Sequence, residues 1–293
     1  MDVLVLGGTS FVGRWITQDL LDRGHPLTLF TRGRTGADLF PGTARATGDR
    51  DAGDYESIAG TTWDAVVDVS GYVPRHVEQA GKAVSAGRYL FISTGSVYDR
   101  LAGRDGMTED SPRLPPYRDS EVVDSDTYGP LKVACEDDVL SLHGDGATIV
   151  RPGVVAGPYD PTDRFTWWTR AEGTVDVPGR LDQPVQVIDA RDLARLVTLL
   201  LERDQAGTYN AVGPQPAVTL GELARVCGAS ELVETETKPG FPLVLPDATW
   251  DVMFRRSAAA ALAAGMPATP LATTAADTRR WDVERGLPEI PLP

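Results

Sequence analysis

The sequence predicts an α/β protein with a doubly wound parallel sheet and a smaller C-terminal lobe. Through the first half of the chain, short apolar runs alternate with helical patterns, which is typical of parallel strands joined by crossover helices. After Pro152 this alternation weakens and prolines become frequent, and it returns only over residues 185–212. We therefore expect a main domain of residues 1–152, to which 185–212 return. Residues 153–184 and 213–293 should form the smaller lobe.

Each element of the main domain follows from a local pattern. The six expected strands are short apolar runs, at 3–6, 27–31, 44–47, 65–69, 89–93 and 148–151. The expected helices between them are at 11–23, 55–59, 75–86 and 127–142. The first helix should end at Arg23, because Gly24 readily takes the left-handed conformation that follows a helix end. Further along, we expect strands at 185–188 and 208–212 and helices at 190–202, 220–226 and 257–264.

The stretch GGTSFVG at residues 7–13 lies between the first expected strand and the first expected helix. This order is the context in which a glycine-rich turn binds the pyrophosphate of a dinucleotide, in a domain of the Rossmann type. Gly7 can form the sharp turn and Gly13 lets the helix approach the strand, while the first helical amides can meet the pyrophosphate. A purely structural corner is the alternative. The expected cofactor contacts in this turn are Gly7, Thr9, Ser10, Phe11, Val12 and Gly13.

Residues after the next strands indicate which dinucleotide binds. Arg32 and Arg34 follow the second strand, where an acidic residue would favour NAD and a guanidinium favours the 2′-phosphate of NADP. NADP is therefore the expected cofactor and NAD remains possible, while a solvated loop of cations is the alternative. Further contacts are expected after the third and fourth strands, beside the adenine and under the adenosine. These are Asp49, Arg50, Ser70 and Gly71.

Tyr128 and Lys132 stand one turn apart at the start of the helix expected at 127–142. A phenol with an ordinary pKa of about 10 is a poor base at neutral pH, and a nearby ammonium favours its ionised form. Lys132 can supply that charge while its other donors hold the nicotinamide ribose. The fifth strand ends in Ser93 and Thr94, which leaves hydroxyl groups in the crevice where the nicotinamide should lie.

Together these motifs resemble the extended short-chain dehydrogenase/reductase family, also called the NAD-dependent epimerase/dehydratase family. The resemblance covers nearly the whole chain: the glycine turn, the I-S-T-x-x-V-Y strand end, Y-x-x-x-K, Arg151-Pro152 and V-I-D-A-R-D-L-A at 187–194. The GGTxFxG turn with an arginine after the second strand is similar to a divergent branch of this family. By resemblance, Thr94 hydrogen-bonds the substrate oxygen, Tyr128 is the acid/base, and Lys132 lowers the phenol pKa. Two further cofactor contacts are expected at Pro152 and Val154.

Two departures from the family narrow the expected chemistry. Gly95 and Ser96 stand where the family's dehydratases carry two carboxylates, so elimination lacks its acid and base. Val185 stands where members that act on nucleotide sugars often carry an arginine, although Arg164 or Arg180 could compensate.

The expected function is an NAD(P)-dependent oxidoreductase that transfers a hydride between nicotinamide and a ketone or secondary alcohol of a small molecule. One alternative is an NAD-dependent epimerase, possibly of a sugar or nucleotide sugar, acting by transient oxidation. Another is a non-catalytic homologue that senses dinucleotides or binds RNA. The smaller lobe should bind the substrate, with Trp167 or Trp168 as a candidate wall of its pocket.

Composition limits the partners. The chain has 28 Lys plus Arg against 42 Asp plus Glu, and the net charge of -14 opposes binding to nucleic acid or an anionic membrane. Cys135 and Cys227 are far apart, and His25, His76 and His143 share no ligand spacing, so no metal is expected and the histidines should be at the surface. No apolar stretch approaches the roughly 20 residues that cross a bilayer, and no secretory signal is recognisable. We expect a cytoplasmic monomer or homodimer whose partner is a small-molecule substrate.

Overall fold

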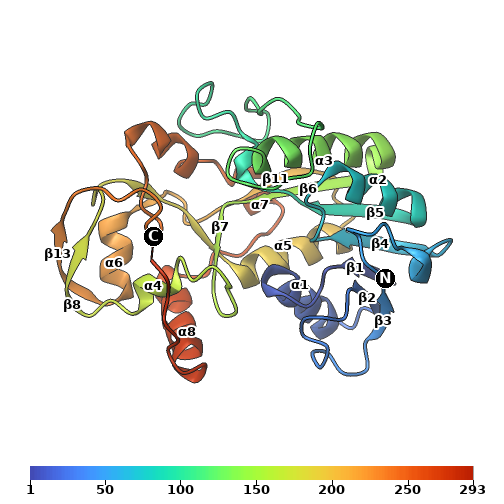
Figure 1. Ribbon diagram of the computed structural model, residues 1–293, viewed down its shortest axis with the longest axis horizontal. Coiled ribbons are helices and arrows are strands. Elements are labelled where there is room, and N and C mark those ends of the chain that lie inside the picture. Colours follow the sequence, from blue (N-terminus) through green and yellow to red (C-terminus); the bar gives the residue numbers. More distant parts are fainter. Residues whose placement is uncertain (293) are drawn as a thin grey trace.

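The computed structural model describes residues 1–292, and a seven-stranded parallel sheet forms its centre (Figure 1). The strand order is β11-β6-β5-β4-β1-β2-β3, so the order reverses between β1 and β4. In such a sheet the ligand crevice opens at the carboxyl ends of the strands, beside this reversal. The strands are β1 (Val3–Leu6), β2 (Leu27–Thr31), β3 (Ala44–Thr47), β4 (Thr62–Asp68), β5 (Ser85–Ile92), β6 (Ala147–Pro152) and β11 (Gly207–Ala211).

Helices cover both faces of this sheet (Figure 1). On one face lie α1 (Phe11–Asp22) and α5 (Ala190–Glu202), and on the other lie α2 (Pro74–Ala83) and α3 (Tyr128–His143). Alternate residues of β1 enter the two cores that result: Val3 and Val5 pack with α1 and α5, whereas Leu4 and Leu6 pack below α2 and α3. The continuous apolar run of β1 follows from this double burial.

A third core lies beside the sheet and contains Trp168, which is fully buried. Around it are the helices α4 (Thr166–Thr169), α6 (Leu220–Cys227) and α8 (Leu271–Glu284) and the parallel pair β8 (Gly173–Val177) and β13 (Ala229–Glu234). We propose that this core defines the smaller lobe. Short strands connect it to the sheet: β7 (Val154–Ala156), β9 (Pro184–Val185), β10 (Val187–Asp189) and β12 (Val218–Thr219).

The C-terminal part of the chain returns once more to the main core. Helix α7 (Ala259–Ala263) places Ala261 in the core formed by α1, α5 and the sheet, and Ala258 and Met266 flank it there. The alanine-rich pattern predicts this helix, but pattern alone does not say which core a run of small residues joins.

Some element boundaries differ from the sequence-based expectation. Residues 84–86 were expected at the end of a helix, but α2 ends at Ala83 and β5 begins at Ser85. The helix expected at 55–59 is a single turn, η1 (Glu56–Ile58). Helix α8 was not expected, because its buried positions hold mainly Thr and Ala and give little hydrophobic periodicity. Three further 3-10 helices are η2 (Gly95–Val97), η3 (Gly144–Gly146) and η4 (Ala248–Phe254). Over residues 1–292, none of the helices has the length and apolar character needed to cross a membrane.

Candidate active site

A cleft of about 700 Å³ opens at the carboxyl ends of the sheet strands, and we call it the central cleft. Its walls combine loops of the main sheet with residues 160–164 and the segment from η4 to Arg256. This volume is in the range of sites that bind cofactors and other small molecules. The expected site residues that line it are Gly7, Thr9, Ser10, Phe11, Val12, Gly13, Arg32, Arg34, Asp49, Arg50, Ser70, Thr94, Tyr128, Lys132, Pro152 and Val154.

The glycine turn is built so that only glycine fits at its two key positions. Gly7 has a φ of +96°, a conformation that side chains rarely adopt. A Cβ atom on Gly13 would lie 2.1 Å from the Gly7 carbonyl oxygen, so α1 packs directly against the turn. The Ser10 hydroxyl makes no capping hydrogen bond within the described chain, which leaves the first amides of α1 facing the cleft. This cradle fits the pyrophosphate of a dinucleotide.

Two arginines lie on the cleft wall just after β2. The Arg32 side chain is about half exposed and its Nη1 atom is 3.3 Å from Asp51 Oδ2, while Arg34 Nη2 is 3.6 Å from Asp49 Oδ2. Ion pairs this exposed contribute little to stability. Both guanidinium groups can therefore exchange their partners for a phosphate that enters the cleft.

Arg50 has a different environment from the one expected of a cofactor contact. It touches the cleft, but its guanidinium donates two hydrogen bonds to the buried Asp68, at 2.6 and 2.9 Å, and others to Ser70 and the His76 carbonyl. Burial alone would raise the pKa of Asp68, but the Arg50 guanidinium holds it below its usual value. Arg50 is thus a neutralised structural ion that shapes the floor of the cleft. Gly71 was also expected to contact the cofactor, but its carbonyl oxygen accepts a hydrogen bond from Lys132.

A buried network fixes the end of β5, from which Thr94 reaches the cleft. Ser93 donates a 2.5 Å hydrogen bond to Glu136 of α3, and Glu136 also pairs with Arg151 of β6 at 2.8 Å. Three elements are thereby tied together directly behind Thr94. Thr94 caps η2, where its hydroxyl oxygen accepts a hydrogen bond from the Ser96 amide at 3.1 Å.

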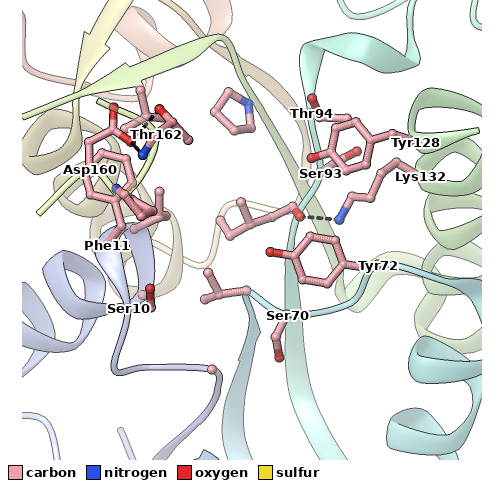
Figure 2. A pocket seen from close by; sticks show the side chains of 18 of the residues that line it. Ser10, Phe11, Ser70, Tyr72, Ser93, Thr94, Tyr128, Lys132, Asp160 and Thr162 are labelled. Atoms are coloured by element: carbon pink, nitrogen blue, oxygen red, sulfur yellow. Dashed lines mark hydrogen bonds between the residues drawn. The ribbon is translucent and has the colours of Figure 1, made fainter. Parts of the chain in front are cut away.

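Tyr128 and Lys132 project from the first turn of α3 on the same side of the cleft as Thr94 (Figure 2). Lys132 is buried and its Nζ donates to the carbonyl oxygens of Gly71 and Ile92 at 2.7 and 2.8 Å. An ammonium has three donors, so one remains for a ligand. Burial lowers the pKa of Lys132 to about 8.

The sequence-based expectation for the Tyr128 phenol needs a correction. Its pKa was expected to be lowered by Lys132, but burial raises the pKa of Tyr128, and the hydrogen bond with Thr94, which lowers it, does not outweigh burial. The physical reason is that the Lys132 ammonium is turned toward two backbone carbonyls. In this arrangement Tyr128 is held protonated at neutral pH, ready to donate a proton.

Several cleft residues carry no motif that sequence reasoning could use. They lie far apart in the chain and meet only in the folded structure: Tyr72, His76, Asp160, Trp250 and Arg256. His76 was expected at the surface but is buried, and burial lowers its pKa. Trp167 and Trp168 lie instead in the lobe core, where both stack edge to face on Phe241.

Within residues 1–292, no cluster of His, Cys, Asp and Glu side chains is arranged to hold a metal ion. Cys135 and Cys227 are free and buried, and burial raises the pKa of each thiol to about 12. Neither thiol is therefore an activated nucleophile.

The doubly wound sheet, the glycine turn and the Thr94, Tyr128 and Lys132 constellation define a protein of the extended short-chain dehydrogenase/reductase class. Residues 53–212 match the model of the NAD dependent epimerase/dehydratase family, and the chain belongs to this family.

Two curated relatives are 27% and 28% identical to the chain over the aligned residues. The chloroplast stem-loop binding protein of 41 kDa b from Arabidopsis thaliana is 27% identical over an alignment of 246 positions that covers 77% of this chain. The chain spans 62% of that relative's length. The epimerase family protein SDR39U1 from Bos taurus is 28% identical over an alignment of 306 positions that covers 95% of this chain and 95% of the relative.

Solved structures share the fold at lower identity. Human epimerase family protein SDR39U1, solved with NADPH, has a TM-score of 0.66 and 20% identity, over 96% of this chain and 99% of its own. MoeE5, solved with UDP-glucuronic acid and NAD, has a TM-score of 0.68 and 20% identity, over 97% of this chain and 100% of its own. These similarities show a common fold.

Proposed function

We propose that the protein is an NADP(H)-dependent oxidoreductase that acts on a ketone or secondary alcohol of a small molecule. The observation that carries this proposal is the placement of Thr94, Tyr128 and Lys132 in the same cleft as the glycine turn and Arg32. One cleft thus offers a pyrophosphate cradle at one end and a proton donor beside a second hydroxyl at the other.

Each of the three residues has a separate task. A bound nicotinamide supplies a hydride to the carbonyl carbon, or accepts one in the reverse direction. Tyr128 donates its phenol proton to the carbonyl oxygen as that oxygen gains electrons, so the product is a neutral alcohol. Thr94 hydrogen-bonds the same oxygen and orients it. Lys132 has one free donor for the cofactor ribose.

NADP is the proposed cofactor because Arg32 and Arg34 lie at the end of β2, where the adenosine ribose binds in this fold. A guanidinium suits a 2′-phosphate. The structure of human SDR39U1 with NADPH supports the choice, whereas MoeE5 was solved with NAD.

An epimerase would use the same three residues and is the second candidate. It is favoured by the family's name and by the nucleotide sugar in the MoeE5 structure. An epimerase oxidises and re-reduces one carbon without releasing its cofactor, so net turnover of free cofactor separates the two activities. RNA binding, which the name of the Arabidopsis relative suggests, is disfavoured by the net charge of -14.

The proposal is tested by measuring NADPH and NADH binding to the purified protein, followed by a screen of carbonyl compounds for loss of NADPH absorbance. A reductase should bind NADPH more tightly than NADH and oxidise free NADPH in proportion to product. An epimerase should give isomerised product with no net change in absorbance. Failure to bind either dinucleotide would refute both.

A further inference from the structure

One arginine side chain of the central cleft has neither a hydrogen-bond acceptor nor an ion-pair partner among residues 1–292. Arg256 lies between η4 and α7, lines the cleft and is only 5% exposed. Its Nε and Nη1 atoms are buried and have no hydrogen-bond partner among residues 1–292. In the same part of the chain, no carboxylate forms an ion pair with it, and the charged or titratable group that acts on it is the Tyr98 phenol.

The Arg256 guanidinium occupies the space beside the Thr94 turn. A Cβ atom on Gly95 would lie 1.2 Å from Arg256 Nη1, and one on Gly153 would lie 3.2 Å from Nη2. The guanidinium therefore fills the volume that a side chain at position 95 would take. Its positive charge lies next to the residue that follows Thr94, on the side of the cleft where the substrate oxygen is proposed to bind.

The main chain of Arg256 is held firmly. The Gln186 side chain accepts a hydrogen bond from the Arg256 amide at 3.0 Å and donates one to its carbonyl oxygen at 2.9 Å. Gln215 donates a further bond to the same carbonyl oxygen at 2.7 Å. The next amide, that of Ser257, donates to the Met107 carbonyl oxygen at 2.8 Å. The arginine is thus positioned before any ligand binds.

A buried, unpaired cation is costly to the folded protein. Burial lowers the pKa of Arg256 to about 10, so the group still carries its proton at neutral pH. No described residue forms a hydrogen bond or ion pair that compensates the Arg256 guanidinium for its lost hydration. A ligand that places a negative charge beside the guanidinium would compensate for it.

Building on the proposed function, we infer that the substrate is a monoanionic carboxylate, of the 2-oxo acid or 2-hydroxy acid type, whose carboxylate pairs with Arg256. The Arg256 guanidinium carries one positive charge that no carboxylate among residues 1–292 balances, and a single carboxylate supplies the matching negative charge. The planar guanidinium matches a planar carboxylate through two parallel N–H···O bonds. Because the Arg256 guanidinium and Thr94 flank the same turn, the carboxylate and the reacting oxygen lie on neighbouring carbons of the substrate.

The test is a calorimetric titration of the protein loaded with NADP⁺, which has no hydride to give to a 2-oxo acid, in a buffer free of carboxylates and phosphate. The probes are pyruvate, its neutral isostere pyruvamide, and inorganic phosphate. Pyruvate should bind at least about tenfold more tightly than pyruvamide, as expected for a hydrogen bond between charged groups. Arg256→Met should abolish this preference. Gly95→Ala should also weaken it, because the added methyl group displaces the guanidinium.

Arg255→Met is the matched control, because it removes the same charge from the neighbouring residue. The Arg255 guanidinium pairs with Asp105 at 2.9 Å on the surface. This variant should keep the preference for pyruvate. Thermal unfolding separates binding from structure: losing an unpaired buried cation should leave the unfolding midpoint of Arg256→Met unchanged or raised, whereas a structural arginine would lower it.

The inference is overturned if wild-type protein binds pyruvate no more tightly than pyruvamide, if phosphate binds more tightly than pyruvate, or if the preference survives in Arg256→Met. NADPH binding is measured first in the same instrument. Its absence contradicts the proposed function and this inference together, whereas NADPH binding without a preference for pyruvate contradicts the inference alone.

Discussion

Replacing Arg32 by alanine should weaken NADPH binding selectively. Arg32 lines the cleft after β2, and its pair with Asp51 is long, at 3.3 Å, and about half exposed. Such a pair contributes about 0–1 kcal/mol, so leaving Asp51 for a phosphate costs little. A hydrogen bond between charged groups contributes about 1.5–3 kcal/mol. The net loss in the variant is then about 0.5–3 kcal/mol, or about 2- to 140-fold in Kd for NADPH.

The assay is a fluorescence titration of wild type and Arg32→Ala with NADPH and, separately, with NADH. NADH lacks the 2′-phosphate, so its Kd should change by less than about threefold. Arg45→Ala is the matched control, because Arg45 is an exposed arginine of the adjacent strand β3 and lies outside the cleft lining. Equal weakening of both dinucleotides, or an unchanged Kd for NADPH, would refute the assignment of Arg32 to the 2′-phosphate.

Three other perturbations test the surrounding structure. Gly13→Ala places a methyl group against the Gly7 carbonyl oxygen and displaces α1, so titration should show NADPH affinity falling at least about tenfold and urea unfolding a loss of about 1–3 kcal/mol. Arg50→Met leaves Asp68 buried and unpaired, and should lower the unfolding free energy at pH 7 by about 3–5 kcal/mol. Without Arg50, burial raises the pKa of Asp68 above 3.8, whereas Arg50 holds it below 3.8 in wild type. The deficit should therefore shrink as the pH falls through 3.8, and an undiminished deficit would contradict the ion pair. Burial lowers the pKa of Lys132 from 10.5 to about 8, so between these pH values the unfolded chain binds more protons than the folded one. The unfolding free energy of wild type should therefore rise relative to that of Lys132→Met, by up to about 3 kcal/mol from pH 8 to pH 10.5. If urea unfolding gives the same difference at both pH values, burial does not lower the pKa of Lys132.

The parts of the fold that the sequence predicts well are those with strong local patterns. The residues of β1 are apolar at every position because both faces are buried, and Gly7 and Gly13 are required by the turn itself. Tyr128 and Lys132 are one helical turn apart, so their spacing alone places them on one face of α3. Each of these predictions depends on residues that are close together in the chain.

The parts that could not be predicted depend on contacts between distant segments. Arg256 contacts the turn after Thr94 although more than half of the chain separates them in sequence. Only this contact explains why position 95 is a glycine. Arg50 follows a strand just as a cofactor contact would, and only the folded structure pairs it with Asp68. Trp168 reads equally well as a pocket wall or as core, and its indole donates to the Pro242 carbonyl within the lobe.

Catalysis by Tyr128 is tested most directly by single-turnover oxidation of NADPH with a carbonyl substrate from the screen, in wild type and Tyr128→Phe. The substitution removes only the phenol hydroxyl. The rate should fall by about a hundred-fold to ten-thousand-fold, the usual contribution of a positioned proton donor, while the Kd for NADPH stays within about threefold of wild type. Tyr128→Phe protein that oxidises NADPH as fast as wild type would contradict the account.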